Sequence, residues 1–468
     1  MHQLIKKVFA FIMGVCMLSC MMKNVILQAA PQNIKNQTFC AGTYFSAFVM
    51  EDNSLWTCGG SGVLGKSYIM PEQWMAGNWL QESNGVPVKV MDDVKSVYSN
   101  GDMTCYVIKL DNSLWALGEN DGAFGDGTIQ PSKVPVKIMD DVVYIESKKY
   151  SGIEKKGIEG QDYLSYHGNA VIALKSDGSL WSWGTNHWGE VGDGTREPRL
   201  LPVKIMDHVA FATNGKSKFG MNDEFLSTYA VKIDGSLWAW GSNDVGQLGN
   251  GTMDSQVVPV RITDNVQTIE ADDGTCYITK QDGSYWGWGL DYSNAVGGLA
   301  LYTIVCSPKK IADGVAAVTA GDLEKYFIKE DGTLWAWGRA PRLDLTGSGQ
   351  SFDAASPVPI MSQVRDIHDG EFTTFAIRTD NVLWGWGFND DGEIGIGDLS
   401  VDIQTNPIAV MDQVDSVYTT SFSTYILRTD GTLWGCGSDA YGQFGQGSHE
   451  RRAIPVKIAD HVKVYQYA

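Results

Sequence analysis

A five-residue motif occurs eight times along this chain, and it limits the possible folds more than any other feature. Each copy starts with Asp-Gly or Asp-Asn and ends with Leu-Trp or, once, Tyr-Trp. The copies are Asp52–Trp56, Asp111–Trp115, Asp177–Trp181, Asp234–Trp238, Asp282–Trp286, Asp331–Trp335, Asp380–Trp384 and Asp430–Trp434. Their Trp residues recur at intervals of 48 to 66 residues, and a regular period of this size indicates a repeat architecture.

Each repeat predicts four β-strands. The Asp-Gly or Asp-Asn pair, flanked by β-prone runs such as Tyr229–Ile233 and Ser236–Trp240, predicts a two-residue type I′ hairpin. A Gly-rich loop and a run such as Val134–Met139 follow, then Asp-x-Val and a short alternating run such as Val94–Tyr98. No helical period intervenes. The repeats therefore predict an all-β fold, a closed β-propeller of eight four-stranded antiparallel blades.

Residues 1–30 differ from the repeats. Lys6 and Lys7 precede an apolar run from Val8 to Leu18, and small residues follow. This pattern predicts a signal peptide, with a lipoprotein-type leader and a lipid anchor at Cys20 as the alternative. The run is too short for a membrane span. Residues 31–468 are then one propeller domain in a secreted or cell-surface protein.

Charge and cysteine content narrow the classes of protein to which the chain can belong. The net charge of −19 opposes binding to nucleic acid. Six widely spaced Cys beyond the leader are too few for a disulfide-built scaffold. Cys58 and Cys436 hold the same motif position in blades that adjoin in a closed ring; we expect two buried free thiols, with a disulfide as the alternative.

The segment Leu237–Thr252, with its Trp-Gly-Ser-Asn and Gly-Gln-Leu-Gly runs, closely resembles the signature of the regulator of chromosome condensation repeat family. Related segments start at Trp183, Trp386 and Gly437. The resemblance covers about residues 38–468. It implies a β-propeller, usually of seven blades, so seven is the alternative to eight. Eukaryotic members are guanine-nucleotide exchange factors that dock on nucleosomes, whereas a secreted bacterial relative resembles a protein inhibitor that grips an enzyme with one face.

Ring closure is predicted from the chain ends. A weak strand near Thr38–Cys40 begins the repeats, and a spare strand, Val462–Tyr467, ends them. We expect the last strand to complete the first blade, with a frayed tail as the alternative.

The two propeller faces differ in kind. The first and third connections of every blade meet on one face, and the Asp-Gly turns and blade-to-blade crossings meet on the other. We expect long irregular loops on the first face at Gly62–Val86, Ser147–Gly168 and Thr213–Leu226, which makes it the candidate binding face. The candidate partner-binding residues are its aromatics, Trp74, Trp79, Trp188 and Tyr441. The other thirteen Trp are predicted to pack between blades as core.

The chain offers little catalytic chemistry. Gly60–Ser67 matches a phosphate-binding loop, but no βαβ unit surrounds it, so we expect no nucleotide site. The seven His show no metal spacing, and Asp390–Glu393 lacks a calcium-loop pattern. We expect no cofactor, no metal and no enzyme activity.

The leading hypothesis is thus an exported, monomeric, non-enzymatic scaffold that binds a macromolecule, a protein or a surface glycan, through its long-loop face. A carbohydrate-binding or hydrolytic propeller is the alternative. The exchange activity of eukaryotic relatives does not fit the leader and the acidic charge.

Overall fold

The computed structural model describes residues 37–42, 45–59, 84–99, 104–155, 163–219, 223–272, 274–291, 303–320, 324–339, 353–370, 373–420, 422–447 and 449–464. The predicted leader, Trp74, Trp79 and the Gly60–Ser67 motif lie outside these residues and stay predictions.

Thirty-two strands form eight blades of four. Blades 1 to 4 are β1 Phe39–Ala41, β2 Phe45–Val49, β3 Leu55–Gly59, β4 Asn84–Met91; β5 Val94–Ser99, β6 Thr104–Lys109, β7 Leu114–Gly118, β8 Ser132–Met139; β9 Val142–Lys155, β10 Tyr163–Lys175, β11 Leu180–Gly184, β12 Arg199–Met206; and β13 Val209–Phe219, β14 Asp223–Lys232, β15 Leu237–Gly241, β16 Gln256–Thr263.

Blades 5 to 8 are β17 Val266–Asp272, β18 Thr275–Lys280, β19 Tyr285–Asp291, β20 Thr303–Ala312; β21 Val315–Ala320, β22 Glu324–Lys329, β23 Leu334–Arg339, β24 Asp353–Met361; β25 Val364–Asp369, β26 Thr373–Arg378, β27 Leu383–Phe388, β28 Ile403–Met411; and β29 Val414–Thr419, β30 Ser423–Arg428, β31 Leu433–Gly437, β32 Arg452–Ala459. The described residues contain no helix.

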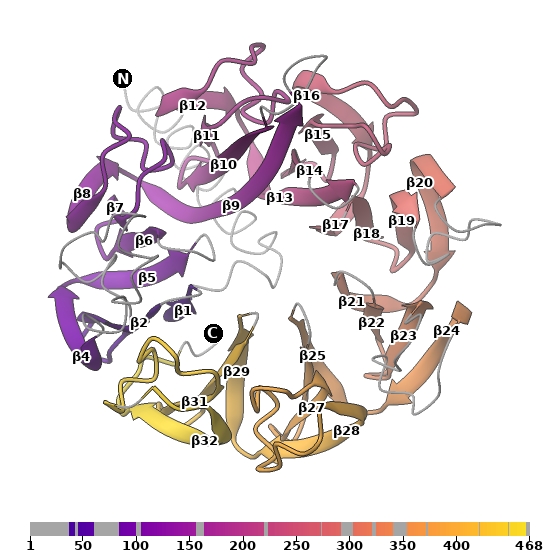
Figure 1. Cartoon of the computed structure of the whole chain (residues 1–468). Coiled ribbons are helices and arrows are strands. Elements are labelled where there is room, and N and C mark those ends of the chain that lie inside the picture. Colours follow the sequence, from indigo (N-terminus) through magenta and orange to yellow (C-terminus); the bar gives the residue numbers. More distant parts are fainter. Residues whose placement is uncertain are drawn as a thin grey trace, which may run out of the picture.

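The blades stand side by side in a closed ring, with the first strand of each at the axis and the fourth at the rim (Figure 1). Strands within a blade pair antiparallel in chain order, as in β5-β6-β7-β8. A bridge between Gly152 and Asp223 additionally joins blades 3 and 4 into one eight-stranded sheet. The prediction of eight four-stranded blades is confirmed, and the seven-blade alternative is wrong.

A series of side-chain hydrogen bonds explains why the hairpin motif contains these residues. In blade 4 the Asp234 carboxylate accepts from both the backbone N–H and the hydroxyl of Ser236, at 2.9 and 2.6 Å. The Trp238 indole then donates to the Ser236 hydroxyl at 3.0 Å. An Asp, a hydroxyl residue two positions on and a Trp four positions on therefore stabilise the turn together.

The predicted type I′ turn is wrong. Only the second residue of the pair has positive φ, for example Gly235 at 79° and Asn53 at 64°, whereas Asp52 and Asp234 do not. The Asn53 N–H donates to the Met50 carbonyl, which gives a type I turn followed by one left-handed residue. The Asp is required here as a hydrogen-bond acceptor, not for its tolerance of positive φ.

The Trp residues fall into two classes, which corrects the prediction that all thirteen form the core. In five blades a second Trp follows two positions after the motif Trp, and it is fully buried where its side chain is described, at Trp183, Trp240, Trp288 and Trp386. The first Trp is only half-buried in all eight copies, because it lies near the turn. In five blades a Lys ammonium lies over this ring, 4.1 to 5.9 Å from its centre.

The buried Trp also tie neighbouring blades together. The Trp240 indole of blade 4 donates to the Glu190 carbonyl in the Gly-rich loop of blade 3 at 2.9 Å. The same bond joins Trp288 to Gln247 at 2.8 Å. The loop lies so close that a Cβ on Gly192 would be 2.5 Å from the Trp240 Nε1. A glycine is therefore required at position 192 for two reasons: a side chain would collide with the Trp240 ring, and the backbone φ is +84°.

Ring closure uses both chain ends. β1 pairs with β2 and forms most of the inner strand of blade 1. Val462, fully buried, extends that strand by a bridge to Met50, and the Lys463 N–H donates to the Val49 carbonyl. The C-terminal segment thus contributes to blade 1 as predicted, but as an extension of β1; residues 465–468 lie outside the described part.

Every rim strand carries a proline, at Pro87, Pro135, Pro202, Pro259, Pro308, Pro357 with Pro359, Pro407 and Pro455. A proline has no N–H to offer, so it discourages strand addition at these exposed edges.

Candidate interaction site

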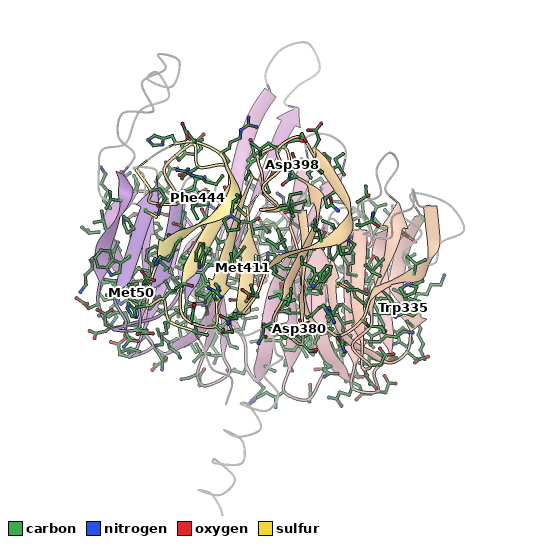
Figure 2. All side chains as sticks on the ribbon, turned by 90° about the horizontal axis from the view of Figure 1, so that it is seen from below. Met50, Trp335, Asp380, Asp398, Met411 and Phe444 are labelled. Atoms are coloured by element: carbon green, nitrogen blue, oxygen red, sulfur yellow. The ribbon has the colours of Figure 1, made fainter. Side chains whose placement is uncertain are left out.

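The two faces of the ring are distinct, as the repeats predicted. Asp398 and Phe444, in loops between third and fourth strands, lie toward one face, which we call the loop face (Figure 2). Asp380 and Trp335, at the hairpin turns, lie toward the opposite, turn face (Figure 2). All connections that vary in length between blades emerge on the loop face.

Blades 3 and 4 each carry a lengthened hairpin, and one of them rises above the loop face (Figure 2). We call the two hairpins the crest: residues 147–155 and 163–168 of β9 and β10, and residues 213–219 and 223–226 of β13 and β14. β9 and β10 pair continuously up to Tyr163 and Lys155, and β13 pairs with β14 up to Phe219 and Asp223. The sequence predicted irregular loops here, which is wrong. Backbone pairing between the added residues extends the blade sheets instead.

The base of the crest is braced by blade 5 and by a loop of blade 3. The Gly274 N–H donates to the Lys216 carbonyl at 3.1 Å. The Trp188 ring meets the Phe225 ring edge to face, with 4.9 Å between centres. These contacts fix where the crest leaves the ring.

The structure locates two of the four predicted partner-binding residues. Trp188 and Tyr441 are both half-buried in third-to-fourth-strand loops of the loop face, in blades 3 and 8. Blades 3 and 8 are three blades apart around the closed ring, so the two side chains do not form one cluster. Trp188 has a bracing contact with Phe225 that the sequence did not reveal, because Phe225 belongs to the next blade.

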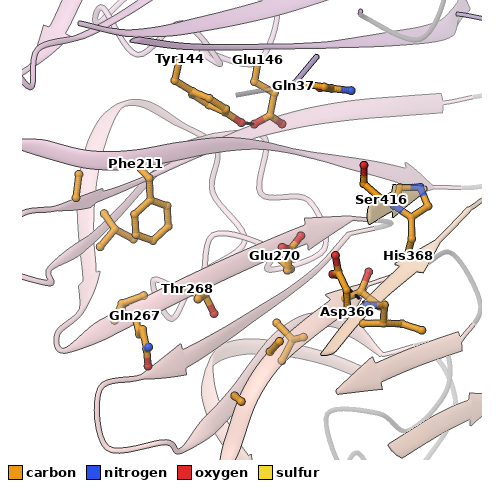
Figure 3. Close-up of a pocket in the computed structure, with 18 of the residues that line it drawn as sticks. Gln37, Tyr144, Glu146, Phe211, Gln267, Thr268, Glu270, Asp366, His368 and Ser416 are labelled. Carbon is orange, nitrogen blue, oxygen red and sulfur yellow. Dashed lines mark hydrogen bonds between the residues drawn. The ribbon is translucent and has the colours of Figure 1, made fainter. Parts of the chain in front are cut away.

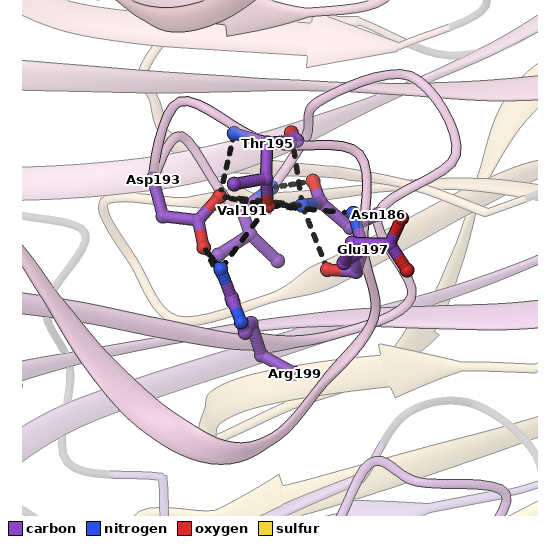
Figure 4. A network of polar contacts seen from close by, with 6 residues as sticks. All are labelled: Asn186, Val191, Asp193, Thr195, Glu197 and Arg199. Atoms are coloured by element: carbon purple, nitrogen blue, oxygen red, sulfur yellow. Dashed lines mark hydrogen bonds and ion pairs between the residues drawn. The ribbon is translucent and has the colours of Figure 1, made fainter.

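A buried Asn organises the Gly-rich loops of blades 2, 3, 4 and 7. In blade 3, the Asn186 side-chain oxygen accepts from the Val191 N–H at 3.0 Å (Figure 4). Its amide nitrogen donates to the carbonyls of Thr195 and Glu197 at 3.1 and 3.0 Å (Figure 4). Asn120, Asn243 and Asn389 make corresponding bonds in blades 2, 4 and 7. Such loops present their exposed residues in a preformed arrangement.

The exposed surface of these loops is acidic. In the described third-to-fourth-strand loops the exposed basic residues are Arg196 and Arg451. The exposed acidic residues there are Asp121, Glu197, Asp244, Asp254, Asp390, Asp398, Asp402 and Glu450. This excess of negative charge favours a positively charged counterpart.

A cavity of about 1430 Å³ occupies the axis of the ring, lined by the first strands of all eight blades. Glu146, Glu270, Asp366 and His368 line it (Figure 3). The Tyr144 hydroxyl donates to Glu146 at 2.8 Å (Figure 3). The cavity wall has six carboxylates against one lysine, counting also Asp282, Glu330, Asp415 and Lys232.

The described ranges hold no group of three or more His, Cys, Asp or Glu side chains arranged for a metal ion. In the same ranges no helix has the length and hydropathy to cross a bilayer. All six described Cys, Cys58 and Cys436 included, are free thiols, which confirms that prediction for this pair.

Comparison with known proteins agrees with this geometry. The family model of the Regulator of chromosome condensation (RCC1) repeat matches residues 177–212, 234–271 and 430–467, which cover hairpins of blades 3, 4 and 8 and the strands that follow. The chain carries RCC1 repeats. This confirms the repeat family suggested by the Gly-rich loops.

Relatives of this RCC1-repeat chain match it over part of their length. The ultraviolet-B receptor UVR8 of Arabidopsis thaliana is 25% identical over 180 residues, 38% of this chain and 36% of the receptor. The human E3 ubiquitin-protein ligase HERC2 is 27% identical over 154 residues, 33% of this chain and 3% of the ligase. The solved structure of human WBSCR16 has the same fold, with a TM-score of 0.50 and 17% identity, over 71% of this chain and 86% of that one.

Proposed function

We propose that this RCC1-repeat propeller is an exported, non-enzymatic scaffold that binds a partner protein through its loop face, with the crest as the principal contact. Propellers of this family typically mediate protein interactions. The observation that carries the proposal is the asymmetry of the ring: the added backbone of two blades is paired, braced and raised on one face. Rigid projecting strands lower the entropy that binding must overcome.

The charge of the loops indicates the chemistry of the partner. The loop face exposes many carboxylates and few bases, so a partner surface rich in Lys or Arg would complement it. Such pairing speeds association and makes it sensitive to salt.

The β9–β10 part of the crest offers a deletion that leaves the rest of blade 3 in place. Ser151 pairs with His167, and Tyr150 pairs with Gly168. Replacing Ser151–His167 by a two-residue Asn-Gly turn would leave blade 3 a hairpin similar in length to those of its sister blades. Proteins captured from the native envelope or medium would be ranked by affinity for the full chain and for this variant.

Charge variants separate the two faces. Asp398→Lys with Asp402→Lys reverses charge on the loop face, and Asp140→Lys with Asp313→Lys does so at exposed turn-face sites. We expect the crest and loop-face variants to weaken partner binding at least tenfold and the turn-face variant to leave it unchanged. Binding that depends only on the turn face, or that is specific for glycans alone, would refute the proposal.

A further inference from the structure

One buried acid in blade 8 occupies an unusual position. Asp439 is fully buried at the start of the loop between β31 and β32. One of its oxygens, Oδ1, accepts from the Phe444 N–H at 2.9 Å. The other, Oδ2, is buried without a hydrogen-bond partner. A charged carboxylate that is buried with one oxygen unpaired has lost the water that would stabilise it, and this desolvation costs a large free energy.

The sister blades show what this position normally holds. Asn120, Asn186, Asn243 and Asn389 occupy it in blades 2, 3, 4 and 7, and each uses its amide nitrogen to donate to loop carbonyls. Asp291 holds the position in blade 5, where the following loop lies outside the described residues. An ionised carboxylate is an acceptor only, whereas a protonated carboxyl supplies one O–H donor. Asp439 can therefore imitate the amide only while it carries a proton.

The surroundings of Asp439 favour the protonated form. Burial raises its pKa from 3.8 to about 6, although the Phe444 N–H and the charges of Arg452 on β32 and His449 in the loop pull the pKa the other way. The remaining titratable groups that face it are the Cys58 thiol on β3 and the Tyr425 hydroxyl on β30. Burial holds the pKa of both well above their usual values, so neither compensates a charge on Asp439.

Asp439 is linked directly to the seam between the last and first blades. Its partner Phe444 follows Gln443, whose carbonyl accepts the Cys58 thiol at 3.1 Å and the Ser46 hydroxyl at 2.8 Å. Cys58 and Ser46 belong to blade 1. The bond from Phe444 to Asp439 therefore helps to hold the carbonyl that closes the ring.

We propose that the loop Ser438–Gly447 is a pH-controlled latch of the ring: protonated Asp439 holds the loop against blade 1, and ionised Asp439 loosens it. The latch concerns the ring itself and does not depend on which partner the loop face binds.

The direction of the pH effect follows from the two protonation equilibria. An opened loop exposes Asp439, which then ionises near its ordinary pKa of 3.8, while the closed loop keeps the proton up to about pH 6. Opening therefore becomes more favourable as pH rises from about 4 to about 6 and then levels off. Between pH 5 and pH 7.5 the opening equilibrium should rise roughly fivefold to tenfold.

Amide hydrogen exchange, corrected for the intrinsic effect of pH, measures this opening. Exchange in the Ser438–Gly447 loop of the full chain would be compared at pH 5 and pH 7.5 with that in residues 185–194 of blade 3, where Asn186 makes the corresponding bonds. We expect the blade 8 loop to lose protection at pH 7.5 relative to blade 3. Equal protection ratios at the two pH values would overturn the latch.

Two reciprocal variants test the residue. Asp439→Asn should abolish the pH dependence and keep the latch closed at both pH values, and it restores a residue that four sister blades already accommodate. Asn389→Asp should create the same dependence in the blade 7 loop. An unchanged Asp439→Asn profile would refute the proposal. So would protection restored at pH 7.5 by Na⁺, K⁺ or Ca²⁺ alone, because a cation and not a proton would then be the controlling species.

Discussion

The Cys58 thiol of the first blade donates to the Gln443 carbonyl of the eighth at 3.1 Å. This bond corresponds to the one that the Trp240 indole makes to Glu190 between blades 3 and 4. The ring thus closes with the same kind of contact that joins blades 3 and 4, except that a thiol replaces the indole. Burial also raises the pKa of Cys58 to about 12, which makes the thiol a donor and keeps it unreactive.

Closure should depend on the C-terminal segment. Val462 is fully buried in a cluster with Phe39, Phe48 and Tyr425. Val462→Asp places a charge there and should cost about 3 kcal/mol or more of unfolding free energy. Ile454→Asp, at a residue 64% exposed on the rim, is the control and should change the stability by less than about 0.5 kcal/mol. Urea denaturation would compare them, and equal midpoints would contradict the role given to Val462.

The two Trp classes should differ in stability. Trp240→Ala removes a fully buried ring and its bond to Glu190, which should cost about 3–5 kcal/mol. Trp238→Ala removes a half-buried ring near the turn face and should cost about 1–2 kcal/mol. Thermal and denaturant unfolding of both variants would show the difference. A larger loss of unfolding free energy for Trp238→Ala than for Trp240→Ala would contradict the assignment of Trp240 to the core.

Blade 7 lacks one hydroxyl that the other hairpins have. Val382 stands where seven blades have Ser or Thr, and the Trp384 indole N–H is buried without a partner. Val382→Thr should supply the acceptor and stabilise the fold by about 1 kcal/mol. The reciprocal change Thr333→Val in blade 6 removes the acceptor of Trp335 and should destabilise by a similar amount. Calorimetry of both variants checks the sign.

The hairpin carboxylates predict loss of stability in acid. Hydrogen bonds from the Ser or Thr two residues on lower the pKa of Asp177, Asp234 and Asp430 below 3.8. A group whose pKa is lower in the folded state stabilises it above the unfolded pKa, and that contribution is lost as pH falls through the folded pKa. The melting temperature should therefore fall below about pH 4, whereas Asp439 acts in the opposite sense between about pH 4 and pH 6. A melting temperature that is flat from pH 4 to pH 2 would contradict this.

The loop aromatics give a test of recognition. Trp188→Ala or Tyr441→Ala should weaken partner binding by about 2 kcal/mol at one or both positions while the ring remains folded. Because Trp188 also braces Phe225, Phe225→Leu is the matched control. If Phe225→Leu weakens binding as much as Trp188→Ala, Trp188 acts by positioning the crest and not by contact.

The order of strands, the count of blades and the two faces were predictable from the repeat, because each hairpin is stabilised within a few residues. Ser236 reaches Asp234, and Trp238 reaches Ser236, each two positions away. The type of turn was not predictable. Asp tolerates positive φ and is also a strong hydrogen-bond acceptor, and the sequence alone does not distinguish these two roles.

The amino-acid sequence by itself determined the eight blades and the placement of the variable connections on one face, since both follow from local hydrogen bonding and strand alternation. Tertiary structure alone decided which Trp is buried, how the crest is paired and which groups bond across the closing seam. Those features depend on contacts between distant residues, such as the Ser46 hydroxyl and the Gln443 carbonyl, 397 positions apart. The pairing of such groups is set by the curvature of the whole ring, which no single repeat encodes.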